Sequence, residues 1–380
     1  VTSTTNFVKI RESIMEIINS INPREIAKIK VIGVGGGGSN AVSRMFRERI
    51  PGVEYVVVNT DAQALLQSDI PMKIRIGEQL TAGKGVGGDP DLGMRSAEES
   101  REELFEVVRD TDMIFVAAGM GGGTGTGSAP VLAQIAKETG ALTVGVVTKP
   151  FSFEGSKRTK SAEEGIRNLG QNVDTLLVIP NERLHVICDE EITAENAFKM
   201  ADDVLRSGVQ SIAELVTTAG DINVDFADIN TVMRDAGPAW MSIGWGVGEN
   251  RAREAAQQAI TNPLLDVSIE SAKGVLFNVT GGSDLKLSEL HEAAEVIQRV
   301  VDPDANIIFG MVTDPKMENE IKLTIVATGF PTVESMQERE TQIQNMLEDV
   351  LDGEETDLDV PPFLRRYSMS RHNTNGSMNK

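Results

Sequence analysis

The sequence predicts a chain of the α/β class, in which a nucleotide-binding domain with a parallel sheet is followed by a long central helix, a second and smaller α/β domain and a flexible C-terminal tail. Three observations predict this arrangement. In the first half, short runs that are almost wholly apolar alternate with helical stretches, which is typical of a parallel sheet covered on both faces. Two glycine clusters stand where such runs end. A long helical stretch then precedes a second group of strands.

The first domain, residues 27–194, is expected to contain five strands joined by helices. The strands are the apolar runs Ile29 to Val34, Val53 to Val58, Asp112 to Ala117, Leu142 to Val147 and Thr175 to Ile179. The helices are expected at Asn40 to Arg49, Gly93 to Arg109, Ser128 to Glu138 and Thr159 to Leu169. Residues 1–26 precede this domain as a polar N-terminal arm that ends near Pro23.

The central helix is expected over residues 195–220, because apolar residues recur there at three- and four-residue spacing until Gly220 ends the pattern. The second domain, residues 221–330, follows it. Its expected elements are strands at Lys273 to Val279, Ala305 to Val312 and Glu320 to Ala327 and a helix at Glu289 to Val300. Trp240 and Trp245 are interpreted as packing residues of this domain.

Charge and composition exclude several classes of function. The chain of 380 residues has 36 basic against 57 acidic side chains, so its net charge of -21 argues against nucleic acid as a partner and against adhesion to an anionic membrane. No run of 18 apolar residues occurs, so we expect no direct membrane insertion. The single cysteine, Cys188, excludes a disulfide scaffold and fits the cytoplasm. The three histidines are far apart, so no histidine-rich metal site is expected.

The C-terminal end changes character twice. Residues 331–359 form an acidic linker, in which ten acidic side chains between Glu334 and Asp359 face one basic side chain, Arg339. Residues 360–380 have four basic side chains and no acidic one. An acidic spacer before a small basic and partly apolar segment favours a tether that carries a docking peptide.

The two glycine clusters are the strongest functional signal. Residues 33–40 read GVGGGGSN and residues 119–128 read GMGGGTGTGS, and both lead from a strand into a helix. A helix N-terminus offers unpaired N–H groups and about half a positive charge to an anion, and glycine lets a ligand approach the backbone closely. Glycines that only form tight turns are the alternative. Two such loops at one sheet edge favour binding of a polyphosphate.

The first cluster also fits a dinucleotide-binding fingerprint. Gly33, Gly35 and Gly38 have the GxGxxG spacing, and Asp61 follows the second strand, so a dehydrogenase has to be considered. That interpretation does not account for the second cluster or for a third glycine-rich stretch at residues 82–88. No Gly-Lys pair is followed by Ser or Thr, so the common P-loop is absent.

The second cluster resembles the signature of the tubulin/FtsZ family of GTPases, in the segment GGGTGTG at residues 121–127. The segments NTDAQ at 59–63, PFSFEG at 150–155 and NVDFAD at 223–228 resemble the same family. The resemblance covers roughly residues 28–330. It implies a GTP-dependent cytoskeletal GTPase that forms head-to-tail filaments in the cell-division ring at the septum, in the cytoplasm on the inner membrane face.

The resemblance implies a set of residues that hold GTP or GDP. Those expected at the phosphates are Gly36, Gly37, Gly38, Ser39 and Asn40 in the first loop and Gly122, Gly123, Thr124, Gly125 and Thr126 in the second. Glu154 would hold the ribose and Arg158 would lie near the phosphates, whereas a surface ion pair is the alternative at this i,i+4 spacing. Asn181 follows the fifth strand, where nucleotide contacts gather.

The central helix is expected to recognise the base. By the resemblance, Phe198 stacks on guanine, and Asp202, one turn later, accepts hydrogen bonds from the N1–H and the amino group. Adenine presents the wrong donor pattern to a carboxylate. The alternative is that Phe198 belongs to the core and that Asp202 is solvated.

The residues expected to trigger hydrolysis lie elsewhere in the chain. From the residues alone, the segment around Asp225 and Asp228 is the start of a helix with carboxylates near its positive end. The resemblance implies that Asp225 and Asp228, assisted by Asn223, position the attacking water on the GTP of the adjacent subunit. Mg²⁺ is expected to arrive with the nucleotide, since one helix end and Arg158 supply less positive charge than a triphosphate requires.

The segment DVPPFLRR at 359–366 resembles the family's C-terminal docking peptide. Phe363 and Leu364 would anchor it on a membrane-anchoring adaptor such as FtsA, and Arg365 and Arg366 would steer it by charge. An end without any partner is the alternative. Two other functions stay open beside the GTPase: an NAD-dependent oxidoreductase and a nucleotide-gated scaffold that does not hydrolyse GTP.

Overall fold

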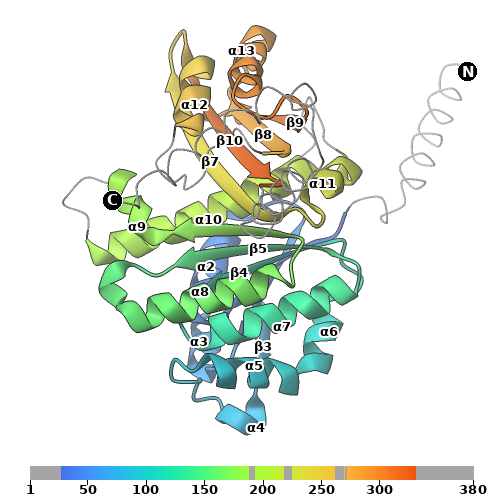
Figure 1. The fold of residues 1–380 in the computed structure, drawn as a ribbon, viewed down its shortest axis with the longest axis vertical. Coiled ribbons are helices and arrows are strands. Elements are labelled where there is room, and N and C mark those ends of the chain that lie inside the picture. Colours follow the sequence, from blue (N-terminus) through green and yellow to red (C-terminus); the bar gives the residue numbers. More distant parts are fainter. Residues whose placement is uncertain (1–26, 188–192, 218–224, 262–268, 270–271, 331–380) are drawn as a thin grey trace, which may run out of the picture. The chain divides into compact units, whose positions relative to one another are not determined.

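The computed structural model describes residues 27–187, 193–217, 225–261, 269 and 272–330 (Figure 1). The predictions for the arm, the acidic linker, the docking peptide and Asn223 lie outside these residues. Ten strands form one sheet in the order β3-β2-β1-β4-β5-β6-β7-β10-β8-β9. They are β1 (Ile29–Val34), β2 (Val53–Asn59), β3 (Met72–Arg75), β4 (Met113–Gly119), β5 (Leu142–Lys149), β6 (Thr175–Pro180), β7 (Gly237–Val247), β8 (Gly274–Gly281), β9 (Asn306–Thr313) and β10 (Glu320–Thr328).

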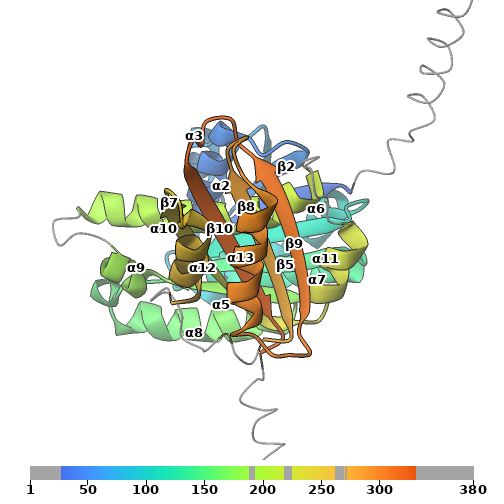
Figure 2. The same ribbon diagram turned by 90° about the horizontal axis from the view of Figure 1, so that it is seen from above.

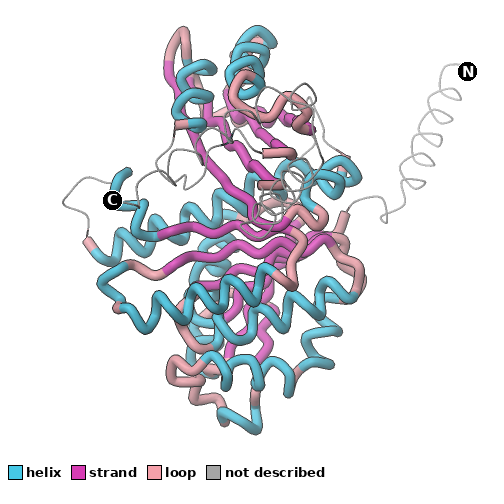
Figure 3. Tube along the Cα trace, viewed as in Figure 1, coloured by secondary structure: helices cyan, strands magenta, loops and turns pink. Residues whose placement is uncertain are grey.

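The five predicted strands β1, β2, β4, β5 and β6 are parallel, as is β3, an edge strand that was not predicted, and a layer of helices covers each face (Figure 3). One face is covered by α2 (Gly35–Glu48) and α10 (Ala194–Thr217). The other face is covered by α5 (Pro90–Glu99), α6 (Arg101–Val108), α7 (Thr124–Glu138) and α8 (Ser156–Gly170). Shorter helices are α3 (Ala62–Gln67), α4 (Glu78–Thr81), α9 (Asn181–Ile187) and α11 (Phe226–Met233).

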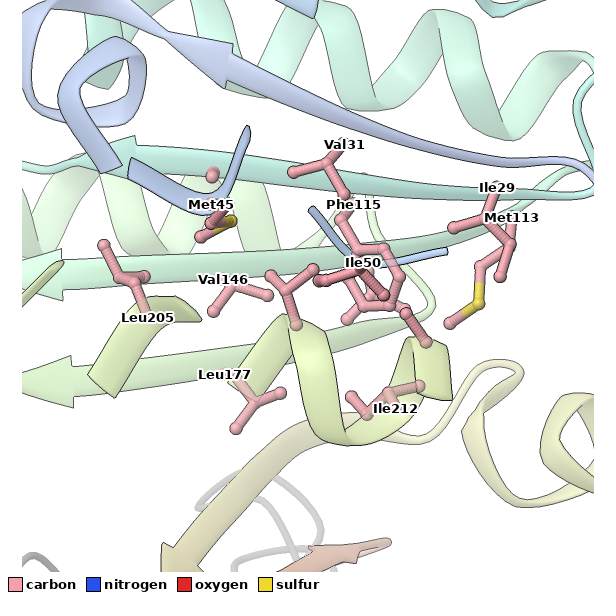
Figure 4. Packing of buried hydrophobic residues seen from close by; sticks show 14 of the residues in the cluster. Ile29, Val31, Met45, Ile50, Met113, Phe115, Val146, Leu177, Leu205 and Ile212 are labelled. Atoms are coloured by element: carbon pink, nitrogen blue, oxygen red, sulfur yellow. The ribbon is translucent and has the colours of Figure 1, made fainter. Parts of the chain in front are cut away.

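The central helix α10 packs on the sheet through one stripe of side chains. Ala197, Ala201, Leu205, Val209 and Ile212 recur at four- and three-residue spacing and are all buried. Leu205 and Ile212 lie against Val146, Leu177 and Phe115 of the sheet (Figure 4). The predicted helix is therefore confirmed. Because this stripe faces the sheet, the polar residues of α10 lie on its other side.

The second group of strands continues the first sheet. Strand β7 pairs with β6 in parallel over three residues and then runs antiparallel to β10. The predicted strands β8, β9 and β10 and helix α13 (Leu287–Gln298) are confirmed. Helix α12 (Arg251–Ile260) lies beside α13 (Figure 2).

Neither strand β7 nor helix α12 was predicted. In β7, glycines interrupt the apolar pattern that would have marked a strand. A Cβ atom on Gly244 would lie 2.7 Å from the Ala259 nitrogen, and one on Gly246 would lie 2.6 Å from the Arg251 carbonyl carbon. Close approach of α12 requires glycine at both positions. Trp240 packs against Phe330, with ring centroids 6.1 Å apart. The interpretation of Trp245 as a packing residue is wrong, because its side chain is 51% exposed.

All four predicted helices of the first domain differ from their predicted bounds, and α8 does so only by starting three residues earlier and ending one residue later. The stretch predicted as one helix from Gly93 to Arg109 is two helices that meet at Ser100, whose hydroxyl accepts a hydrogen bond from the Gly77 N–H. Helices α2 and α7 begin inside the glycine clusters rather than after them. The clusters are therefore the first turns of two helices, which places N–H donors directly at the strand ends.

Helices α5 and α7 approach each other so closely that glycine is needed at the contact. A Cβ atom on Gly127 would overlap the Pro90 carbonyl oxygen and lie 2.6 Å from the Met94 nitrogen. We expect Gly127→Ala to lower the free energy of unfolding by about 1–3 kcal/mol, since backbone has to move. Urea unfolding measures this. Gly170→Ala is the control, because its Cβ would meet only a Leu176 methyl at 3.4 Å. An unchanged midpoint for Gly127→Ala would contradict the packing described here.

Candidate nucleotide-binding site

The two glycine loops lie side by side. Strands β1 and β4 are parallel neighbours, and their carboxyl ends deliver the loops to the same edge of the sheet. A Cβ atom on Gly37 would lie 3.2 Å from the Gly119 Cα, and one on Gly35 would lie 2.6 Å from the Gly125 nitrogen. The N-termini of α2 and α7 therefore converge, which makes this edge a site for a multiply charged anion.

Glycines in these loops serve two different purposes. Gly35 has a φ of 71°, and a Cβ atom on Gly38 would lie 3.2 Å from the Ala118 Cα. Backbone conformation therefore requires glycine at the first position, and close packing requires it at the second. By contrast, no atom lies within 4 Å of a Cβ atom built on Gly36 or Gly122. Turn geometry thus accounts for some of the glycines, and an open approach to the backbone accounts for the others.

The third glycine-rich stretch, to which the sequence assigned no role, lies at the same site. Residues 82–88 form a loop with five residues at positive φ, and a Cβ atom on Gly123 would lie 2.8 Å from the Asp89 nitrogen just after this loop. Gly87 and Gly88 face open space. Three glycine-rich loops therefore border one region. The glycine content that residues 82–88 share with the two clusters was the sequence signal that could have placed them at the site.

Asp61, the acidic residue of the dinucleotide fingerprint, is used as a helix cap. Its Oδ1 accepts hydrogen bonds from the backbone N–H groups of Gln63 at 2.8 Å and Ala64 at 3.4 Å, at the start of α3. Asp61 therefore has a structural role at the start of α3, which accounts for an acidic residue at this position without a bound dinucleotide.

Two predicted site residues have buried polar atoms without a partner in the described part of the chain. These are the Ser39 Oγ in the first turn of α2 and the Asn181 Oδ1 where β6 ends, on side chains 5% and 4% exposed. Such atoms cost free energy unless a ligand or water pairs with them. Their position at the strand ends fits a bound nucleotide. Thr124 and Thr126 instead hold the loop: the Thr124 and Thr60 hydroxyls share a hydrogen bond at 2.7 Å, and the Thr126 hydroxyl accepts one from the Gly121 N–H at 2.9 Å.

The predicted base-recognition residues lie on the polar side of α10. Phe198 is 42% exposed and makes edge-to-face contacts with Phe151 and Phe153, with centroids 5.3 and 6.4 Å apart. The alternative that Phe198 belongs to the core and Asp202 is solvated does not match these positions, since the Asp202 side chain is only 16% exposed. Burial raises the pKa of Asp202 to about 6, although the Arg44 guanidinium 3.2 Å away opposes the rise.

Glu154, two residues before α8, forms an ion pair with Arg158 in the first turn of that helix. Glu154 also accepts a hydrogen bond from the Phe151 N–H at 3.0 Å. The exposed side chain of Arg158 matches the surface-pair alternative, but the side chain of Glu154 is only 12% exposed, and the position beyond the β5 end matches the nucleotide-site interpretation. Their roles at the ribose and phosphates therefore stay predictions.

Asp225 and Asp228 are not brought to the glycine loops. They stand at the start of α11, both exposed, and the side chain of Asp225 makes no capping hydrogen bond. Just after α11, Arg234 donates to the Gly140 carbonyl at 3.2 Å and the Gly237 N–H donates to the Asp174 carbonyl at 2.8 Å.

These anchors place α11 at the opposite edge of the sheet. Gly140 and Asp174 precede β5 and β6, so they lie where the parallel strands begin, whereas the glycine loops lie where strands end. Eight residues of β5 at about 3.3 Å each separate the edges by roughly 25 Å. In Figure 1, the arrow of β5 points away from α11. Asp225 and Asp228 therefore cannot reach phosphates bound at the glycine loops of their own chain.

A cleft of about 840 Å³ lies between α5, α7 and α8. Of the residues predicted to hold the nucleotide, only Thr126 and Arg158 line it; Gly87 and Gly88 of the third glycine-rich stretch line it too, but the first glycine loop does not. Acidic, basic and amide side chains line it together. We do not assign the nucleotide to this cleft, because it lies along α7 rather than across the strand ends.

Within the described residues, no three His, Cys, Asp or Glu side chains are grouped as a metal site requires. Among the helices that the structure describes, none has the length and apolar character needed to cross a bilayer.

Comparison with known proteins decides the family. The GTPase-domain model of the Tubulin/FtsZ family matches residues 28–189, and the FtsZ family C-terminal domain model matches residues 237–331. An empty FtsZ dimer from M. jannaschii is 45% identical, with 84% of this chain and 92% of that chain covered and a TM-score of 0.79. The chain belongs to the tubulin/FtsZ family. As a member, it has the family's GTPase domain, which supports binding of GTP and GDP and GTP hydrolysis.

Two other solved structures place this family member among its relatives. A mutant FtsZ from M. jannaschii is also 45% identical, covers 85% of this chain and 96% of its own, and has a TM-score of 0.78. CetZ1 from Haloferax volcanii, solved as a GDP-bound monomer, is 24% identical, covers 84% of this chain and 99% of its own, and has a TM-score of 0.70. The CetZ1 likeness concerns the fold alone.

Proposed function

We propose that this chain is a polymerising cytoskeletal GTPase of the cell-division ring and that it hydrolyses GTP between adjacent subunits. GTP lies on the glycine loops of one subunit, and Asp225 and Asp228 of the next subunit, with Asn223, position the attacking water. The observation that carries this proposal is the separation of the glycine loops and α11 to opposite edges of one sheet.

Head-to-tail stacking resolves that separation. When the strand-end edge of one molecule meets the α11 edge of another, exposed carboxylates of the second are delivered to the phosphates of the first. A carboxylate can then orient the water or accept its proton, as in other phosphoryl-transfer enzymes. The M. jannaschii relative was solved as a dimer, and CetZ2 from Haloferax volcanii was solved as a GTPgS-bound protofilament, which supports self-association.

The residues present fit a bound nucleotide. Ser39 and Asn181 offer unpaired buried polar atoms, and Gly36 and Gly122 leave the backbone open to phosphate oxygens. Mg²⁺ bound with the nucleotide would neutralise phosphate charge that the helix N-termini balance only in part. The chain itself contributes loop N–H groups for orientation and carboxylates from the neighbour for water.

A nucleotide competition assay tests this function against the alternatives. We expect GTP and GDP to displace a fluorescent guanine nucleotide, ATP and NAD to fail, and bound GTP to be converted to GDP and phosphate. Displacement by NAD would instead favour the oxidoreductase. GTP that stays intact at assembling concentrations would favour a nucleotide-gated scaffold.

The C-terminal peptide is proposed to tether filaments to the membrane through an adaptor such as FtsA. Removing residues 360–380 is expected to leave GTP-dependent sedimentation of filaments unchanged and to abolish binding to the adaptor. The reason is that Phe363 and Leu364 provide the apolar anchors and Arg365 and Arg366 the charge. The double variant Phe363→Ala, Leu364→Ala should reproduce the loss of binding. Loss of sedimentation on truncation would contradict a tether.

A further inference from the structure

Helices α2 and α10 lie side by side in parallel register, joined by two ion pairs. Arg44 Nη1 lies 3.2 Å from Asp202 Oδ2, and Arg206 Nη1 lies 2.7 Å from Glu48 Oε2. The two pairs are four residues apart on both helices, so they lie on the same facing sides of the helices, one turn apart. The helices also share one apolar cluster beneath these pairs.

One turn earlier, the same faces carry two predicted nucleotide residues. Asn40 precedes Arg44 by four residues, and Phe198 precedes Asp202 by four residues. Asn40 is exposed and Phe198 is 42% exposed, so this end of the paired faces is open to solvent. Moving along the two helices therefore leads from the phosphate loop, through the residues predicted to hold the base, to the Arg44–Asp202 ion pair.

The charges around Asp202 are unevenly arranged. From α2 it faces Arg44, with Glu48 one turn further on. On α10 itself the charged neighbours are Glu195 and Lys199, which pair with each other, and Asp203 and Arg206. The side chain of Asp202 is only 16% exposed, and among these groups Arg44 opposes the effect of burial on its pKa whereas Asp203 adds to it.

Guanine recognition depends on the charge state of Asp202. An ionised carboxylate accepts hydrogen bonds from both the N1–H and the 2-amino group, whereas a protonated one has lost an acceptor and gained a donor. Nucleotide binding therefore favours the ionised form. Because the pKa of Asp202 lies at about 6, affinity for guanine nucleotides should be constant above pH 7 and fall up to tenfold per pH unit below 6.

We propose that Arg44 is a positioning residue for base recognition, which holds the carboxylate of Asp202 ionised and oriented and thereby couples the phosphate-binding helix α2 to the base-reading helix α10. The proposal rests on guanine binding at this site, as proposed above. Arg44 does not itself need to touch the nucleotide. Its ion pair uses one carboxylate oxygen, and each oxygen has two lone pairs, so the base can still bind both.

The test is the pH profile of GDP affinity between pH 5.5 and 8, measured with a fluorescent GDP on the full chain, at concentrations too low for assembly. For Arg44→Gln we expect the fall in affinity to begin about one pH unit higher than in the unchanged protein, since an opposite charge at this distance moves a carboxyl pKa by at least that much. At pH 6 the variant should bind about five- to tenfold more weakly, and at pH 8 within about threefold.

Two further variants separate positioning from structural support. Arg44→Lys keeps the charge and should return the profile to that of the unchanged protein. Glu48→Gln removes the other ion pair between the same helices and should leave the profile in place.

Four results would count against the proposal or against the function on which it rests. A profile of Arg44→Gln that coincides with the unchanged protein, or an equal loss at every pH, overturns the proposal, because a merely structural role would give the second result. If Arg44→Lys fails to restore the profile, positioning by charge is overturned as well. If the unchanged protein does not bind GDP at pH 8, the proposed function fails instead.

Discussion

Replacing Asp225 with alanine is expected to leave GTP affinity unchanged and to lower the rate of GTP hydrolysis by at least about 100-fold, which is the lower end of what a positioned general base contributes. Asp225 stands at the start of α11, on the sheet edge opposite the glycine loops, and its carboxylate is exposed. A residue so placed has no contact with the nucleotide of its own chain. Fluorescent GTP binding and phosphate release, measured on the same preparation, separate the two effects.

Asp304→Ala is the matched control, because it removes an exposed carboxylate from the turn before β9, away from α11. This variant should hydrolyse GTP at the normal rate. Loss of GTP binding in Asp225→Ala would show that the residue belongs to its own chain's nucleotide site. Unimpaired hydrolysis would remove it from the mechanism.

Asp202→Asn is expected to change the preferred base from guanine to xanthine. An asparagine presents an amide NH₂ where the carboxylate presented an acceptor, so it opposes the 2-amino group of guanine donor to donor. Xanthine has a carbonyl oxygen at that position and restores the pairing. We expect GDP affinity to fall by about 100-fold, corresponding to about 3 kcal/mol for lost charged hydrogen bonds, and xanthosine diphosphate to become the better ligand.

The neighbouring residue supplies the control for this change of base. Asp203→Asn alters a carboxylate that is adjacent in sequence but 55% exposed, and it should retain the preference for guanine. Competition of both diphosphates against one fluorescent nucleotide measures the preference. An Asp202→Asn variant that still prefers GDP would show that Asp202 does not read the base.

Much of the fold could be predicted because its signals are local. The five apolar runs of the first domain and the stripe of α10 from Ala197 to Ile212 need no knowledge of distant residues. Strand β7 was missed because Gly244 and Gly246 interrupt its apolar pattern. They are required by the close packing of α12, which lies later in the chain. The break at Ser100 was missed for the same reason, because its partner is the backbone of Gly77.

The candidate site was predictable in composition but not in arrangement. Two glycine clusters at strand ends favour phosphate binding, but only the packed structure brings residues 82–88 against the second cluster. Arg44 carried no signal of its own, since its partner Asp202 lies on another helix. The position of Asp225 depends on anchors at Gly140 and Asp174, so no local pattern could show which edge it occupies.

The most direct test of catalysis shared between subunits is GTP hydrolysis per molecule across a protein dilution series, with sedimentation to report assembly. Specific activity is expected to fall steeply as soon as dilution removes contacts between subunits, because the carboxylates of one molecule are then no longer held at the phosphates of another. Constant specific activity in samples that contain only monomers would contradict shared catalysis.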